Sequence, residues 1–145
     1  MFTPSRDQAR NFLFDTWAKH QAGHPLTDLE KLVFSVIARH PEYHSILEDR
    51  ERYAERDYPP ELGETNPFLH LSMHLAIEEQ LSIDHPHGVR ALYETLCQRL
   101  GDEHAAQHET MDCLAEMIWQ SQRNRLPFDS GRYLDCLRGK AGLAD

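Results

Sequence analysis

Helix signals recur along the whole chain, and no stretch shows the strict alternation of apolar and polar residues that is typical of a β-strand. Thr27 and Glu30 have the spacing of a helix capping box, and Asn66 with Pro67 combine an N-cap residue with a first-turn proline. Each signal precedes apolar residues that repeat every three or four positions. The sequence therefore predicts an all-α, bundle-like single domain of about five to seven helices over residues 1–145.

The spacing of caps, glycines and prolines gives approximate bounds for these helices. The apolar pattern fails over residues 49–65, which predicts a long loop that is either a lid or binding segment or a solvated connector. The stretch 67–81 is apolar on almost every side, so it is expected to be the most enclosed helix. The remaining helices are expected over residues 4–21, 27–40, 42–48 as a short helix or a kinked continuation, 84–100, 102–122 and, after a cap at Asp129 or Ser130, 130–137. Thr3 and Pro4 are expected to cap the first of these helices, and Trp17 and Trp119 are expected in the core.

The charge and the cysteine content limit the classes of function. Fifteen basic against 24 acidic residues give a formal net charge of -9, which disfavours binding to nucleic acid or to an anionic membrane surface. No apolar run is long enough to cross a membrane and no signal peptide is recognisable, so a cytoplasmic location is expected. The cysteines, which are widely spaced and odd in number, are expected to be reduced packing residues: Cys97, Cys113 and Cys136.

Histidine is the unusual residue of this sequence, since eight of the ten histidines form pairs four positions apart. That spacing places two side chains on one face of a helix. Glycine or proline interrupts two of the pairs, whereas His70/His74 and His104/His108 lie within strong helix patterns that direct them inward. The interrupted pairs are His20/His24 and His40/His44.

Buried imidazoles need partners, and a shared metal ion supplies one to several rings at once. Neutral imidazoles with a nearby carboxylate suit Zn²⁺, Fe²⁺ or Mn²⁺, and helical bundles build such sites between facing helices. Whether such a metal is structural, hydrolytic or active in oxygen chemistry is left open by the sequence. The predicted ligands are His70, His74, His104 and His108, completed by Glu78 or Asp112.

Two alternatives do not need a metal. The chain could be a non-enzymatic protein-interaction module whose core histidines are hydrogen-bonded for structural reasons, with residues 49–65 meeting a protein partner. A pH sensor is the second alternative, because histidine changes its charge near neutral pH. A helix that is apolar on all sides would also be covered by a second copy in a homo-oligomer. His85 and His87 lie in a predicted turn and are expected to face solvent.

Three stretches of the sequence resemble a known family. They are residues 1–8 (MFTPSRDQ), 66–84 (NPFLHLSMHLAIEEQLSID) and 108–116 (HETMDCLAE). On these motifs the chain resembles the bacterial family called domain of unknown function 1841, and the likeness extends over nearly the whole chain. This resemblance implies a soluble bacterial protein without an assigned activity.

A second and looser likeness is to hemerythrin-type helical bundles that are lined with histidines. His74 with Glu78, followed by His104 with His108, is similar to the central ligand motifs of those proteins in kind and order. His44 would stand for an earlier lone ligand. No histidine follows His108, so the last hemerythrin motif is absent, and the likeness implies a mononuclear or incomplete site.

Overall fold

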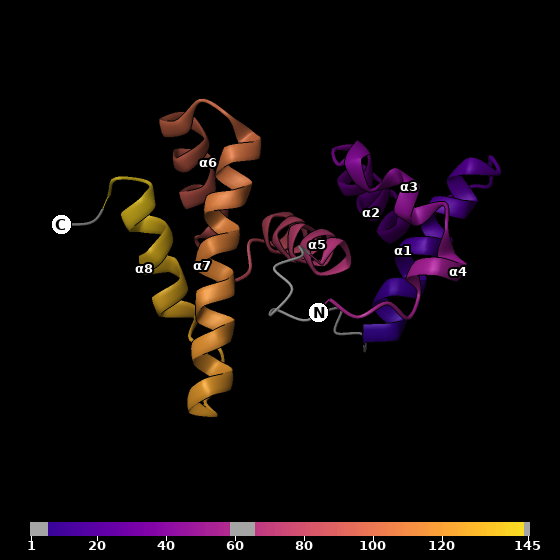
Figure 1. Ribbon diagram of the computed structural model, residues 1–145. Coiled ribbons are helices and arrows are strands. Elements are labelled where there is room, and N and C mark those ends of the chain that lie inside the picture. The colour runs from indigo at the N-terminus through magenta and orange to yellow at the C-terminus, as the bar shows by residue number, and fades with distance from the viewer. Residues whose placement is uncertain (1–5, 59–65, 144–145) are drawn as a thin grey trace. The chain divides into compact units, whose positions relative to one another are not determined.

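The computed structural model describes residues 6–58 and 66–143, and all regular structure in these ranges is helical (Figure 1). The all-α prediction is therefore confirmed. No helix among the described residues is both long and apolar enough to span a membrane. The elements are α1 (Arg6–Gln21), α2 (Asp28–Ala38), the 3-10 turn η1 (Pro41–Tyr43), α3 (His44–Leu47), α4 (Arg50–Tyr53), α5 (Pro67–Ile83), α6 (Val89–Leu100), α7 (Glu103–Asn124) and α8 (Ser130–Lys140).

The helices begin and end close to the capping residues that the sequence indicates. The Thr27 hydroxyl accepts from the backbone N–H of Glu30, whose carboxylate accepts from the N–H of Thr27, so the capping box of α2 is complete. The Asn66 side chain accepts from two backbone N–H groups in the first turn of α5. Asp102 and Asp129 cap α7 and α8 in the same way. The predicted cap at Thr3 and Pro4 lies outside the described residues.

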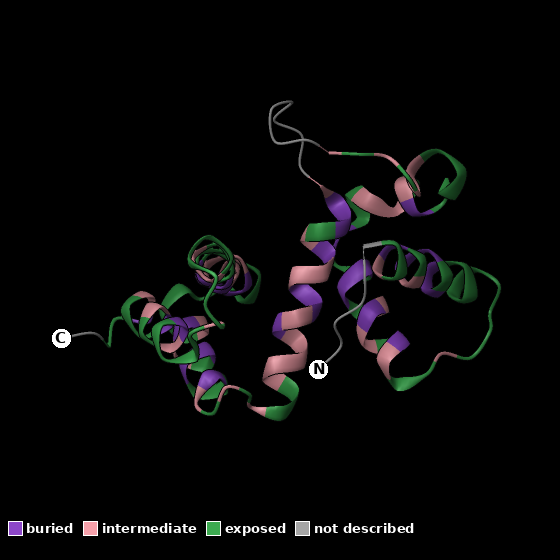
Figure 2. Cartoon of the chain, turned by 90° about the horizontal axis from the view of Figure 1, so that it is seen from below, coloured by how far each residue is buried: buried purple, intermediate pink, exposed green. Residues whose placement is uncertain are grey.

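The chain forms two compact units, Met1–Leu75 and Ala76–Asp145. Helix α5 begins in the first unit and ends in the second. That residues 1–145 form a single domain stays a prediction. Along α5 most residues are buried or half-buried and its C-terminal end is exposed, which fits the predicted enclosure of this helix (Figure 2).

The first unit packs α1 against α2 over an apolar core. Phe14 and Ile37 are fully buried, and Phe14 lies 5.4 Å from the ring of Phe68 at the start of α5. Trp17 is also buried, as the sequence predicts for a core residue. These contacts connect the N-terminal helices to the first turn of α5, where Phe68 lies two residues before His70.

The segment expected to be a long loop contains helical structure in its first part. Asp49 caps the single turn α4, and the guanidinium of Arg10 donates hydrogen bonds to the carbonyls of Tyr53, Ala54 and Arg56. Arg10 is itself buried and lies over the ring of Phe68, at 4.5 Å from its centroid. This part of the segment is therefore fixed to α1, while residues 59–65 lie outside the described ranges.

The second unit packs α6, α7 and α8 side by side (Figure 1). Tyr133 and Leu137 of α8 are fully buried in it, and the Tyr133 hydroxyl donates to the side chain of Gln80 at 2.6 Å. Burial is the main cause that raises the pKa of the Tyr133 phenol far above its ordinary value, so this group stays protonated as a donor.

Two predictions for the second unit are wrong. Cys113 and Cys136 form a disulfide that joins α7 to α8, and only Cys97 is free among the described cysteines. Sequence spacing does not show that Cys113 and Cys136 face each other, because this depends on how α8 packs against α7. Trp119, expected in the core, is 52% exposed near the end of α7, where its ring lies beside the Arg123 guanidinium.

Candidate metal site

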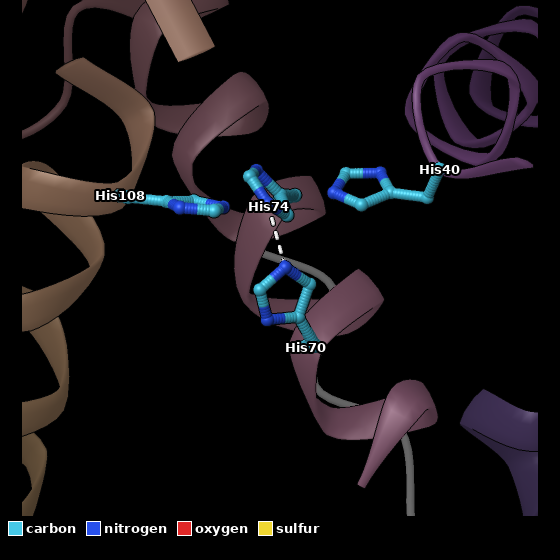
Figure 3. Close-up of side chains that lie close together, drawn as sticks. All are labelled: His40, His70, His74 and His108. Carbon is cyan, nitrogen blue, oxygen red and sulfur yellow. Dashed lines mark hydrogen bonds between the residues drawn. The ribbon is translucent and has the colours of Figure 1, made fainter. Parts of the chain in front are cut away.

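Two histidines of α5 form the first part of the site, since His70 and His74 are one helical turn apart. Their ring centroids lie 4.8 Å apart, and the two Nε2 atoms are separated by 3.2 Å (Figure 3). One nitrogen of this pair donates a hydrogen and the other accepts it. The spacing of four residues on α5 therefore does what the sequence predicts and brings two imidazole nitrogens together.

His40 is the third histidine of the site, and it follows the end of α2. Because proline disfavours helical geometry in the residue before it, Pro41 explains why His40 leaves the helix, with φ -127° and ψ 64°. Its Nδ1 lies 2.8 Å from the carbonyl oxygen of Val36. A carbonyl can only accept, so Nδ1 carries the hydrogen and Nε2 carries the lone pair.

The three rings lie close enough to share one ion. The His40 ring centroid is 5.2 Å from that of His70 and 4.5 Å from that of His74. One nitrogen from each ring lies within 4.8 Å of the others. Two imidazole nitrogens bound to a tetrahedral Zn²⁺ at 2.0–2.1 Å are about 3.3 Å apart. The separation of 3.2 Å between the Nε2 atoms of His70 and His74 is close to that value.

The surroundings of this cluster are enclosed and aromatic. His40 and His74 are 2% and 1% exposed, whereas His70 is half-buried. The Tyr43 ring lies parallel to His40 at 5.8 Å and edge-on to His70 at 5.9 Å. Burial, with a smaller effect of the Glu42 charge, raises the pKa of Tyr43, so the cluster borders a neutral phenol. The histidines are thus held between α2, η1 and α5 in a poorly hydrated place.

The second unit contains the predicted carboxylates. Glu78 accepts a hydrogen bond from the side-chain amide of Gln107 at 3.2 Å, and the same amide lies 3.1 Å from the Tyr93 hydroxyl. Gln107 is fully buried, so this network fixes the Glu78 carboxylate against α7. Asp112 is exposed on α7. That Glu78 or Asp112 ligates a metal stays a prediction.

His104 and His108 form a pair on α7, with ring centroids 4.3 Å apart. His108, which Figure 3 also draws, is half-buried. The predicted inward direction is wrong for His104, which is exposed in the first turn of α7. The buried face of α7 contains Ala106, Gln107 and Thr110. The apolar pattern of this helix therefore did not predict that His104 is exposed. That His104 and His108 share a metal with His70 and His74 stays a prediction.

The histidine pair that contains His40 is one of the two pairs that glycine or proline interrupts in the sequence. The signal was present in the spacing of His40 and His44, but Pro41 argued against a shared helix face. In the structure the two rings separate: His44 Nε2 donates to the Ile37 carbonyl at 2.9 Å, and the His44 ring lies tilted against the ring of Trp17, with centroids 4.4 Å apart. His40, and not His44, therefore joins the α5 histidines. His85 and His87 are exposed, as predicted.

Comparison with known proteins adds a family but no activity. The model of the family described as a domain of unknown function, DUF1841, matches residues 5–139. No curated protein and no solved structure matches the chain in the comparisons made.

Proposed function

Because the chain belongs to the DUF1841 family, whose description assigns no activity, we propose a function from the site itself. The protein binds a divalent transition metal, with Zn²⁺ as the first candidate and Fe²⁺ or Mn²⁺ as alternatives. His40, His70 and His74 are its ligands. The observation that carries this proposal is that three imidazoles converge in one enclosed place with ligand nitrogens in mutual reach.

The hydrogen bond of His40 supports ligation by that ring. Histidines that bind metals commonly donate their other ring N–H to a carbonyl or carboxylate, which fixes the tautomer and the ring orientation. His40 makes this bond through Nδ1 to Val36, four residues earlier on the same helix end. Its Nε2 lone pair is thereby directed away from α2 before any metal arrives. A preformed ligand loses less conformational freedom on binding.

His108 is the proposed fourth ligand. The support for His108 is its place in the sequence, four residues after His104 on α7, and its half-buried side chain; a fourth imidazole would complete a tetrahedral shell. The exposed His104 is left out of the ligand set, since the other four histidines already supply the ligands of a four-coordinate ion.

Metal analysis of the untagged full-length protein tests the proposal. We expect one metal ion per chain after incubation with Zn²⁺ and removal of excess, and loss of that ion in His70→Ala and His40→Ala. His24→Ala is the matched control, because His24 is exposed in the same unit and lies outside the cluster. Circular dichroism of each variant separates loss of a ligand from loss of the fold. Wild-type protein that retains no metal would overturn the proposal.

His108→Ala tests the fourth position separately. If His108 is a ligand, its removal should lower the affinity for Zn²⁺ at least about tenfold, as loss of supporting groups does at metal sites. Unchanged affinity would remove His108 from the ligand set and leave the three histidines of the first unit.

The second candidate function is a non-enzymatic interaction module, and one observation favours it. The bond from His40 to Val36 and the contact between His70 and His74 already give these rings partners without an ion. In that case His70→Ala should destabilise the fold equally with and without Zn²⁺. A metal-dependent difference between the two conditions would exclude it.

A further inference from the structure

We propose that an exposed stripe along α7 is a dimer interface, which packs antiparallel against the same stripe of a second copy of this chain. The stripe consists of four residues spaced four, three and four positions apart: Asp112, Glu116, Trp119 and Arg123. It begins one turn after His108 and lies wholly within the second unit, so the proposal does not depend on a metal ion.

The stripe lies on the side of α7 that faces away from the core of the second unit. The buried residues of this part of the helix are Cys113, Leu114 and Met117, whereas all four residues of the stripe are exposed. Residues with this spacing fall on one line along a helix. The stripe is therefore a continuous helix face that the described part of the chain leaves uncovered.

Trp119 lies in the middle of the stripe and gives it an apolar centre. Trp119 is 52% exposed, and Ile118 next to it is 37% exposed. The Arg123 guanidinium lies over the Trp119 ring, at 5.0 Å from its centroid. Tryptophan and arginine are the residue types that contribute most often to binding energy at protein interfaces, because they combine a large contact area with a polar group. A partner that covers this face would bury both of them.

The charges along the stripe change sign at Trp119. Asp112 and Glu116 precede this residue, whereas Arg123 and the exposed Arg125 follow it. None of these four charged side chains forms an ion pair with another residue in the ranges that the structure describes. The stripe is therefore acidic towards the start of α7 and basic towards its end.

A second copy of the chain is the partner that fits this pattern of charges. In an antiparallel pair with its two-fold axis at Trp119, residues at similar distances before and after Trp119 face each other. Glu116 lies three residues before Trp119 and Arg123 four residues after it, so each Glu116 faces the Arg123 of the other copy. Asp112 and Arg125 are matched in the same way, and the symmetry forms each ion pair twice. A parallel arrangement would instead place like charges opposite each other.

The net charge of the chain limits self-association to such a face. Two copies with a formal net charge of -9 each repel one another over most of their surfaces. The stripe offers attraction in one orientation only. Because it occupies part of a single helix, the contact is at the small end of protein interfaces, and we expect a dissociation constant in the micromolar range.

Sedimentation velocity of the full-length protein, from micromolar to submillimolar concentrations, tests for the dimer. We expect a reversible equilibrium between monomer and dimer without larger species, because a two-fold contact is complete with two copies. Trp119→Ala should weaken the association at least about thirtyfold, since each dimer loses both rings. High salt should also weaken it, because exposed ion pairs are screened. Circular dichroism of each variant checks that these exposed substitutions leave the fold unchanged.

Reversal of the charges tests the antiparallel arrangement. Glu116→Arg and Arg123→Glu should each weaken the dimer at least about tenfold, because each places like charges opposite one another twice. The double variant Glu116→Arg/Arg123→Glu should restore the association to within about threefold of the wild type, since the pair forms again with its signs reversed. Glu94→Arg, at an exposed position of α6 in the same unit, makes the same change of charge outside the stripe and should associate as the wild type does.

The outcomes decide both the partner and the orientation. Wild-type protein that stays monomeric at all concentrations overturns the inference, and so does a dimer that Trp119→Ala leaves unchanged, because it would use another surface. Loss of association in both single variants with recovery in the double variant supports the antiparallel pair, since an effect on α7 alone would not be reversed. A double variant that does not recover overturns the pairing of Glu116 with Arg123.

Discussion

The two units of the chain are stabilised in different ways. In the first unit the enclosed space beside α2 and α5 contains three imidazoles, two of them almost fully buried. In the second unit the corresponding interior is filled by Leu96, Tyr133 and Leu137, and a disulfide joins α7 to α8. Its buried polar residue Gln107 is hydrogen-bonded within the unit, to Glu78 and Tyr93. The first unit leaves polar ring nitrogens there, in a place where an apolar residue would be less costly.

This difference supports the proposal that the first unit holds the metal. Buried polar groups are retained where they do something that apolar packing cannot do, and clusters of metal-ligating side chains are the usual case. Within the second unit a disulfide joins α7 to α8, and the buried network at Gln107 connects α5, α6 and α7. The predictions below test this division, beginning with the largest expected effect.

Zinc should stabilise the first unit selectively. At a free concentration about 1,000 times the dissociation constant, it should add about 4 kcal/mol to the unfolding free energy of the unit that binds it. Hydrogen exchange measured by mass spectrometry should show slower exchange in α2 and the start of α5, with little change in α6 and α8. Equal protection of all helices would contradict the division into a liganded and a self-sufficient unit.

Removal of the disulfide should weaken the second unit by about 3 kcal/mol. The bond closes a loop with a sequence separation of 23 residues, and loops of this size restrict the unfolded chain by about that amount. The double variant Cys113→Ala/Cys136→Ala should exchange faster in α7 and α8 than the wild type. The wild type treated with a dithiol reductant should show the same change, and the variant should not respond to reductant. Stability that does not depend on reductant would contradict the prediction.

Arg10→Met should destabilise the first unit by about 2 kcal/mol. The substitution keeps much of the apolar stem over Phe68 but leaves the carbonyls of Tyr53, Ala54 and Arg56 without this donor. Chemical denaturation followed by Trp17 fluorescence, in a Trp119→Phe background, measures the effect. Arg52→Met is the control, since Arg52 is exposed, and its expected effect is close to zero. An equal loss in both variants would show that the hydrogen bonds of Arg10 contribute nothing particular.

The helices could be predicted from the sequence because their signals are local. A capping box or an N-cap followed by proline acts within one turn, so α2 and α5 begin where Thr27 and Asn66 predict. The same reasoning found the pair His70/His74, because both residues belong to one helix. It also predicted the short helix over residues 42–48, where α3 lies. It failed for α4, whose four residues are too few to show a period.

The rest depends on contacts between distant residues. His40 joins the site because the chain leaves helical geometry before Pro41, and the direction of its ring is fixed by a bond to Val36 that no periodicity reveals. The partnership of Cys113 with Cys136 depends on the packing of α8 against α7. Trp119 was expected in the core from its type and its place on α7, but its ring is exposed and lies beside the guanidinium of Arg123.

The smallest predicted effect concerns the acid stability of the first unit, at Glu30. The hydrogen bond from Lys19 and the N–H of Thr27 lower the pKa of this carboxyl from its ordinary value of 4.5. Its ionised form is therefore favoured by folding, and the stabilisation is present above pH 4.5 and is lost as the pH falls through the lowered pKa. Glu30→Gln should flatten the decline of stability below pH 4.5, measured by Trp17 fluorescence in the Trp119→Phe background. Exposed Glu51→Gln, in the same unit, should leave the decline unchanged. Parallel declines in the wild type and Glu30→Gln would show that acid acts on the first unit through other groups.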